Sequence, residues 1–202
     1  FIPPDQSDIE VYNRKHPSVY NLYSPREYLP YKHTKDDVPA MAAFGDDYRF
    51  HVTGLFHDET GFPTNDPVEI DKKMRRLMRK IDNNLDDILE WEERELDDAD
   101  YAVLAYGSTS RSAASAVADM REDGQKVGLF RPKTLWPFPE DRVRELATRV
   151  KGIVIPELNM GQVALEVERI VAGRTVVKHL GRVDGELLTP EEIRQSVEEV
   201  MA

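Results

Sequence analysis

The sequence predicts an α/β protein of three layers (αβα), in which helices cover both faces of a mostly parallel β-sheet. Over residues 100–202, short runs rich in valine and isoleucine alternate with helical segments of about 10–15 residues, the pattern of repeated βαβ units. Helix stop residues punctuate the same stretch, with Gly124 and Gly173 closing two helical segments. An irregular segment, residues 1–66, and one long helix, residues 67–99, precede this part.

The irregular segment is defined by its composition. Six of the 13 prolines and six of the eight tyrosines fall before position 50, and no helical or strand periodicity persists there. Such a stretch cannot bury enough apolar area by itself, so we expect it to pack on another part of the fold or on a partner. One short strand, followed by a turn, is expected within residues 50–61.

The long helix is predicted from its cap and its apolar stripe. Asp66 can cap the helix and Pro67 suits its first turn. Apolar residues follow at steps of three and four, as in an amphipathic helix: Ile70, Met74, Leu77, Ile81, Leu85 and Ile88. Basic residues crowd its first half and acidic residues its second half, against the helix dipole. This arrangement is either a solvated face or a basic surface for an acidic neighbour.

The α/β part has eight predicted elements. Its strands are expected at residues 101–107, 126–130, 152–158 and 175–181, and its helices at residues 108–124, 140–150, 161–173 and 189–202. The last helix has the clearest start signal, because Thr189 and Glu192 form a capping box around Pro190 at the first helical position.

Bulk composition excludes several classes of function. The 202 residues are 40% hydrophobic and 32% charged, and the formal net charge of −11 argues against a nucleic-acid-binding protein. No apolar run approaches the roughly 20 residues that span a bilayer, and the N-terminal residues lack the features of a signal peptide. The chain has no cysteine, which excludes disulfides, thiolate catalysis and thiolate-ligated iron–sulfur clusters within it and fits a cytoplasmic protein.

Three strand-to-helix junctions are candidate functional sites, because ligands of open α/β sheets bind beyond the carboxyl ends of the strands. At the first junction, Ser108, Thr109 and Ser110 can cap the helix or hold an anion on free backbone N–H groups. Neither the P-loop motif nor the dinucleotide-binding glycine motif is present, so capping is favoured.

The second junction is a compact cluster of two aromatic residues and two prolines, called here the aromatic–proline knot without reference to backbone topology: Trp136, Pro137, Phe138 and Pro139. It contains no general acid, base or nucleophile. Its aromatic residues either pack locally between strand and helix, which is favoured, or anchor an interface.

At the third junction, Glu157 and Asn159 end a strand expected inside the sheet, and Gly161 permits close backbone approach. A buried carboxylate and amide need partners, so structural hydrogen bonding is favoured over substrate contact. Metal binding by His51 and His57 is not favoured, because their spacing differs from the helical pair of zinc proteases.

Three motifs carry a family resemblance: YGSTSRSAASAV (106–117), GLFRPKTLWPFPED (128–141) and VIPELNMGQVALEV (154–167). In this order and spacing they resemble the C-terminal half of the alpha subunit of 2-oxoacid:ferredoxin oxidoreductases, most closely the 2-oxoglutarate members. The segment VTGLFHDETGFPTNDP (52–67) resembles the stretch before this domain, so the similarity runs over most of residues 20–202. The strand–helix layout is shared with the C-terminal domains of transketolase and of the pyruvate dehydrogenase beta subunit.

The resemblance implies part of a thiamine-diphosphate enzyme that decarboxylates a 2-oxoacid, transfers the acyl group to coenzyme A and reduces ferredoxin. It implies that residues 1–66 are the tail of a thiamine-binding N-terminal domain missing from this fragment, and that residues 100–202 are a transketolase C-terminal-like domain. Thiamine diphosphate, magnesium and the iron–sulfur cluster would belong to other domains or to a beta subunit. No catalytic, cofactor-binding or metal-binding residue is therefore carried over to this chain.

What the resemblance transfers is a structural role, in subunit or interdomain contact. Seven residues are the candidates: Trp136, Pro137, Phe138, Glu157, Asn159, Gly161 and Gln162. Two alternatives stay open, namely a non-catalytic, flavodoxin-like module that binds a nucleotide or anion, and the C-terminal domain of another thiamine enzyme. The sequence leaves the 2-oxoacid and the oligomeric state open.

Overall fold

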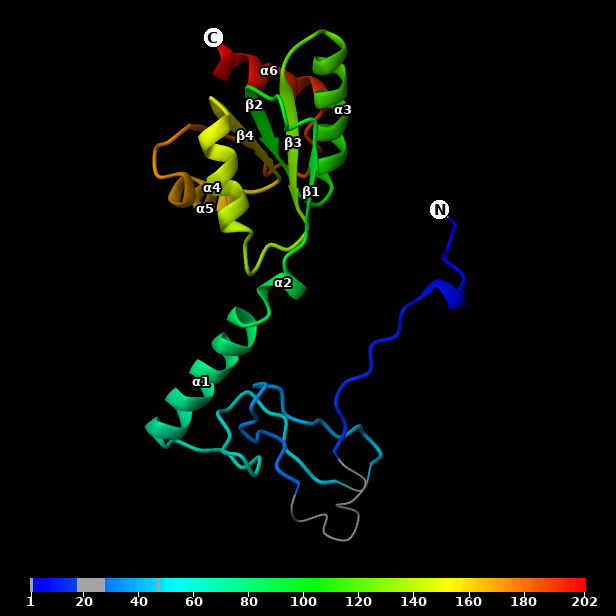
Figure 1. Ribbon diagram of the computed structural model, residues 1–202, viewed down its shortest axis with the longest axis vertical. Coiled ribbons are helices and arrows are strands. Elements are labelled where there is room, and N and C mark those ends of the chain that lie inside the picture. Colours follow the sequence, from blue (N-terminus) through cyan, green and yellow to red (C-terminus); the bar gives the residue numbers. More distant parts are fainter. Residues whose placement is uncertain (1, 18–27, 47) are drawn as a thin grey trace. The chain divides into compact units, whose positions relative to one another are not determined.

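The computed structural model describes residues 2–17, 28–46 and 48–202, and the chain divides into two compact units, Phe1–Asn84 and Leu85–Ala202 (Figure 1). The expectation of irregular chain at residues 1, 18–27 and 47 lies outside the described residues. Among the residues that are described, no helix is long and apolar enough to cross a membrane.

Regular structure is sparse in the described part of the first unit. It comprises the 3-10 helix η1, Gln6–Asp8, and the helix α1, Pro67–Asp82. The strand expected within residues 50–61 is absent. Instead, the backbones of Asp58 and Phe62, and of Thr64 and Phe56, are joined by hydrogen bonds of 2.9 Å around an isolated bridge between His57 and Pro63. A turn this tight leaves no room for a strand ladder.

Polar contacts hold α1 to the preceding chain. The Arg79 guanidinium binds both carboxylate oxygens of Asp37, with Nε and Nη2 at 2.9 and 2.6 Å, and this contact lowers the pKa of Asp37. Arg76 is 3% exposed and donates to the Asp37 carbonyl oxygen at 3.1 Å. Lys73 lies 3.9 Å from the centre of the Tyr31 ring. Cationic side chains of α1 therefore hold the described part of the first unit together, a role that an aliphatic core plays in larger domains.

The prediction of one helix over residues 67–99 is wrong in its second half. Helix α1 ends at Asp82, as Asn84 Nδ2 donates to the Lys80 carbonyl oxygen at 2.6 Å and closes the last turn. A short helix, α2 (Leu85–Ile88), and a strand, β1 (Trp91–Arg94), follow. Strand β1 pairs antiparallel with a strand far along the chain, a non-local contact that the apolar stripe cannot reveal.

The second unit confirms the predicted three-layer α/β fold. Its remaining strands are β2 (Tyr101–Leu104), β3 (Val127–Pro132), β4 (Gly152–Glu157) and β5 (Val176–Gly181). The sheet has the order β1-β3-β2-β4-β5, and all neighbouring pairs except β1 with β3 are parallel. The helices are α3 (Thr109–Glu122), α4 (Glu140–Arg149), α5 (Gln162–Val171) and α6 (Pro190–Met201).

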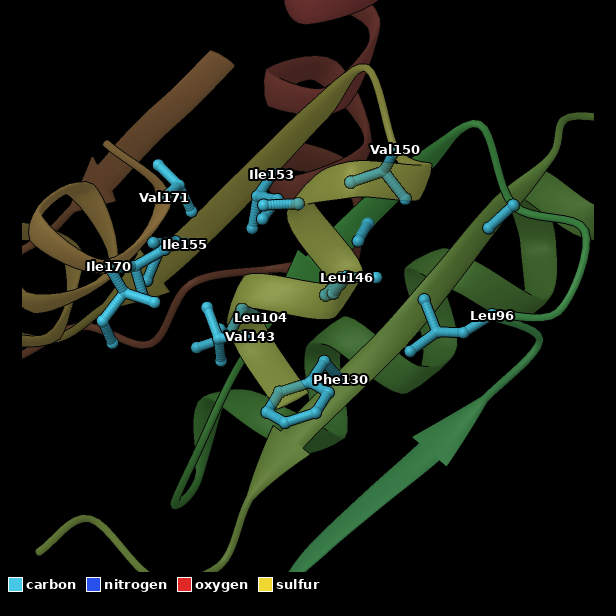
Figure 2. Close-up of a cluster of buried hydrophobic side chains, with 14 of the residues drawn as sticks. Leu96, Leu104, Phe130, Val143, Leu146, Val150, Ile153, Ile155, Ile170 and Val171 are labelled. Atoms are coloured by element: carbon cyan, nitrogen blue, oxygen red, sulfur yellow. The ribbon is translucent and has the colours of Figure 1, made fainter. Parts of the chain in front are cut away.

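Two hydrophobic cores lie on opposite faces of the sheet, and Figure 1 shows the helices on either side of it. Helices α4 and α5 cover one face, and Figure 2 shows their side chains interlocking with those of the strands: Leu104, Phe130, Val143, Leu146, Ile153, Ile155 and Ile170. Helices α3 and α6 cover the other face through side chains that include Val117, Met120, Ile193 and Val197. Since both faces of the central strands are buried, their continuous apolar runs are explained.

Candidate functional site

The carboxyl ends of β2 and β4 meet at the point where the order of the sheet reverses. The chain passes from β2 to β3 on one side, while β4 and β5 continue on the other side of β2. Open α/β sheets place ligands in the crevice beyond such a switch point. In this protein Tyr106, which follows β2, and Glu157, the last residue of β4, lie at this point of the sheet.

The carboxylate of Glu157 is hydrogen-bonded within its own chain. The residue is 1% exposed, and its carboxylate accepts the backbone N–H of Val163 at 3.0 Å and that of Ala164 at 2.9 Å. The Tyr106 hydroxyl donates to the same carboxylate at 2.8 Å. A negative charge at the start of α5 is favourable because the free N–H groups and the helix dipole point toward it.

Asn159 completes this arrangement. Its Oδ1 accepts the backbone N–H of Gly161 at 2.7 Å and that of Gln162 at 3.2 Å, and its Nδ2 donates to the Tyr106 hydroxyl oxygen at 2.8 Å. Together, Asn159 and Glu157 therefore bind the four successive N–H groups from Gly161 to Ala164. The position normally open to a phosphate or other anion is filled by side chains of the protein.

Gly161 is required for its backbone. Its φ of +98° lies in the left-handed region, and a Cβ there would stand 3.3 Å from the ring of His179. His179 Nε2 lies 3.8 Å from the Glu157 carboxylate and is buried without a hydrogen-bond partner. The imidazole of His179, on β5, thus lies beside Gly161 and the Glu157 carboxylate.

The electrostatics of the crevice keep Tyr106 protonated. Burial, and after it the hydrogen bond and negative charge of Glu157, raise the pKa of Tyr106 to about 12. A phenol with such a pKa acts as a hydrogen-bond donor at neutral pH and cannot serve as a base. The role available to Tyr106 is therefore to hold the β4–α5 loop in position.

The start of α3 differs from the predicted cap. The side chain of Ser108 makes no capping hydrogen bond. Thr109 and Ser110 instead donate their hydroxyls backward, to the carbonyl oxygens of Tyr106 and Gly107, each at 2.7 Å. The hydroxyls tighten the β2–α3 turn and are not directed toward a ligand.

The aromatic–proline knot divides into a buried and an exposed part. Phe138 packs against the core beneath α4 and α5, whereas Trp136 is 65% exposed beside a cis peptide bond to Pro137. Thr134, just before the knot, donates its hydroxyl to the Ile88 carbonyl oxygen at 2.8 Å and accepts the Glu90 N–H at 3.0 Å. The loop is therefore anchored on the residues that lead into β1.

The structure brings the seven predicted contact residues to one edge of the sheet, in two groups. Trp136, Pro137 and Phe138 follow β3, and the other four end β4 or begin α5. Trp136 and Gln162 are exposed, whereas Glu157 and Gly161 are buried and can affect a contact only through the loop that they position. Whether any of them contacts another domain or subunit stays a prediction.

Sequence reasoning missed Tyr106, which is hydrogen-bonded to Glu157 and Asn159, and His179, which lies beside Glu157. Each is a polar residue at the carboxyl end of a strand predicted to be parallel, and that position was the available signal. His57, considered for metal binding, instead shares a hydrogen bond of 2.8 Å between its Nε2 and the Thr53 hydroxyl. Within residues 2–17, 28–46 and 48–202, no group of three or more His, Asp or Glu side chains is arranged to hold a metal ion.

Comparisons with known proteins agree on one family. Residues 99–193 match the family model "Pyruvate:ferredoxin oxidoreductase core domain II". The 2-oxoglutarate synthase subunit KorA of Methanothermobacter thermautotrophicus is 42% identical over 191 residues, which cover 94% of this chain and 49% of that subunit.

Solved structures also resemble the chain, among them an oxidoreductase and a transketolase. A 2-oxoglutarate:ferredoxin oxidoreductase from Magnetococcus marinus, with 2-oxoglutarate, coenzyme A and succinyl-CoA bound, matches 98% of this chain and 34% of its own with a TM-score of 0.81 and 27% identity. A split-gene transketolase, an inactive beta4 tetramer, matches 55% of this chain and 41% of its own with a TM-score of 0.50 and 17% identity, which supports the transketolase-like fold alone. The chain spans about half the length of the curated relatives it matches.

Proposed function

Because this chain belongs to the family of 2-oxoacid:ferredoxin oxidoreductase alpha subunits, we propose that it forms part of a cytoplasmic, thiamine-diphosphate-dependent 2-oxoglutarate:ferredoxin oxidoreductase. The enzyme oxidatively decarboxylates 2-oxoglutarate, transfers the acyl group to coenzyme A and passes the electrons to ferredoxin. Within it, this chain serves structure and subunit assembly. The observation that carries the proposal is the 42% identity to a 2-oxoglutarate synthase subunit along 94% of the chain.

The residues present do not fit the cofactors of such an enzyme. Without cysteine the chain offers no thiolate ligands to an iron–sulfur cluster. The start of α5, where a diphosphate would be expected in an open α/β sheet, is filled by Glu157 and Asn159. Thiamine diphosphate, magnesium and the cluster are therefore assigned to the remainder of the enzyme, including a beta subunit, and no chemical step is assigned to this chain.

The same filled crevice argues against a nucleotide- or anion-binding module. Such a module needs free donors at a helix start, and here four successive N–H groups of α5 already have partners. The rigid knot at Trp136 supports a docking role, because a prefolded apolar loop loses little conformational entropy when it is covered.

Co-expression with the candidate beta subunit tests the proposal. The complex of the full-length alpha subunit with the beta subunit should reduce ferredoxin with 2-oxoglutarate and coenzyme A, faster than with pyruvate or branched 2-oxoacids, and the 202-residue chain alone should be inactive. A preference for another 2-oxoacid would refute the substrate assignment, and turnover by the isolated chain would refute the structural role.

Trp136→Ala should weaken co-purification with the beta subunit by about tenfold while leaving the chain folded, as expected for an exposed interface tryptophan. Leu165→Ala is a matched control, because Leu165 is equally exposed, at 65%, on the side of α5. Undiminished yield, or gross unfolding of the Trp136 variant, would count against the docking role of the knot.

A further inference from the structure

Three loops at the carboxyl edge of the sheet expose large apolar side chains. The β3–α4 loop carries Trp136, the β4–α5 loop carries Met160, which is 78% exposed, and the β5–α6 loop carries Val183, which is 66% exposed. The full set, called here the carboxyl-edge surface, is Leu135, Trp136, Leu158, Met160, Val183 and Leu187. Five of these six residues were not among the predicted contacts, and no single motif unites them.

Topology brings the three loops together. Strands β3, β2, β4 and β5 are parallel neighbours in this order, so their carboxyl ends point to one edge. At a strand separation of about 4.8 Å, the loops after β3 and β5 start within roughly 15 Å of each other, and the Met160 loop lies between them. The six side chains therefore share one end of the domain.

The exposed area suits a protein partner. Six large apolar side chains, exposed to between 37% and 78%, present an apolar area on the order of 600 Å². That area equals the largest patch of a typical monomer, and it approaches the roughly 800 Å² that each partner contributes to an interface of standard size.

Each loop is fixed before any partner arrives. The Glu157–Tyr106–Asn159 network holds the loop that carries Met160. The β5–α6 loop is closed by the Arg182 guanidinium, which donates to the Leu187 carbonyl oxygen at 2.8 Å and to the Glu192 carboxylate at 2.6 Å. Preformed loops lower the entropic cost of association.

The cations beside these loops, Lys133 and Arg182, are paired within the chain. Lys133, before the knot, lies 2.5 Å from the Glu90 carboxylate, and Arg182 is bound to Glu192. Since these internal partners already neutralise the flanking cations, the complementary surface needs no acidic cluster. An apolar, uncharged patch matches best.

We propose that the carboxyl-edge surface binds an apolar, uncharged patch on the beta subunit of the enzyme. The inference rests on the proposed function and deepens it. The surface includes the exposed Trp136 of the knot, so the partner that docks on the knot also covers Met160, Val183 and Leu187. Glu157 and Gly161 act as positioning residues behind it.

The experiment uses the full-length alpha subunit and the beta subunit. Met160→Asp and Val183→Asp should each weaken subunit affinity at least about tenfold, because a charge is then buried against an apolar patch. The control is Val176→Asp, since Val176 is 57% exposed but lies at the amino end of β5, on the opposite edge. The control should keep wild-type affinity within about twofold, and all three variants should keep the wild-type melting temperature.

Hydrogen exchange on the wild-type proteins provides a second measurement that does not depend on the variants folding. Peptides covering residues 158–161 and 182–188 should become protected only when the beta subunit is added. Protection already present in the isolated alpha subunit would overturn the proposal, because the occupant would then be the same polypeptide. Equal affinity of edge and control variants would overturn it while the wild-type complex stays active. An inactive, unassembled wild-type pair would overturn the proposed function as well.

Discussion

Glu157→Gln should destabilise the second unit by about 3 kcal/mol, although it changes neither the size nor the shape of the side chain. The glutamine amide presents a donor where the Ala164 N–H needs an acceptor, so one charge-assisted hydrogen bond is lost and a buried N–H stays unsatisfied, at about 1.5–3 kcal/mol. The bonds from Val163 and Tyr106 lose their ionic character, which adds about 1 kcal/mol. This sum is a large share of the roughly 5–15 kcal/mol that stabilises a typical domain.

Tryptophan fluorescence during urea unfolding measures this effect selectively. Both tryptophans, Trp91 and Trp136, belong to the second unit, so the signal reports on that unit alone. The midpoint should fall by roughly 1–3 M urea, given slopes of about 1–3 kcal/mol per molar urea. Glu168→Gln, which changes an exposed glutamate of α5, should stay within about 0.5 kcal/mol of wild type. If Glu157→Gln were as stable as Glu168→Gln, the carboxylate would not be what holds the loop.

Three further predictions concern Tyr106, Asp37 and Gly128. Tyr106 should ionise near pH 12 in an ultraviolet titration. Because its folded pKa lies above the usual 10.0, its stabilising contribution is complete below pH 10 and is lost as pH rises toward 12. Tyr106→Phe should abolish the ionisation step near pH 12. The pKa of Asp37 is lowered by Arg79, so the contribution of Asp37 to the stability of the first unit is present above its usual pKa of 3.8 and is lost as pH falls through the lower folded value. Hydrogen exchange of α1, followed as the pH is lowered from about 5 to about 2, should show this loss, and Asp37→Asn should remove the pH dependence. Gly128→Ala should cost at least about 2 kcal/mol in the urea assay, because the added Cβ would lie 2.5 Å from a Leu96 methyl and 2.6 Å from the Glu95 carbonyl oxygen; a Gly128→Ala variant as stable as the wild type would refute the packing argument.

Local signals specified most of the second unit in advance. The capping box of Thr189 and Glu192, Gly124 after its helix and the apolar strands predict elements whose stability depends on neighbours along the chain. The same reasoning failed after Asp82. There the apolar stripe continues, but Trp91–Arg94 gains more by pairing with Leu129–Pro132 than by extending a helix with acidic residues at its negative end.

The sequence by itself determined the order of strands and helices over residues 100–202, the absence of thiolate chemistry and the position of the aromatic–proline knot. Only the tertiary structure decided what the polar residues at the strand ends do. Tyr106 and Glu157 are 51 residues apart and meet because β2 and β4 are neighbours. Spacing along the chain records hydrogen bonds between near residues, whereas bonds across a sheet depend on which strands pair. The sheet order therefore decided that Tyr106 binds the Glu157 carboxylate, whereas the bonds by which Glu157 closes the start of α5 join residues six and seven positions apart.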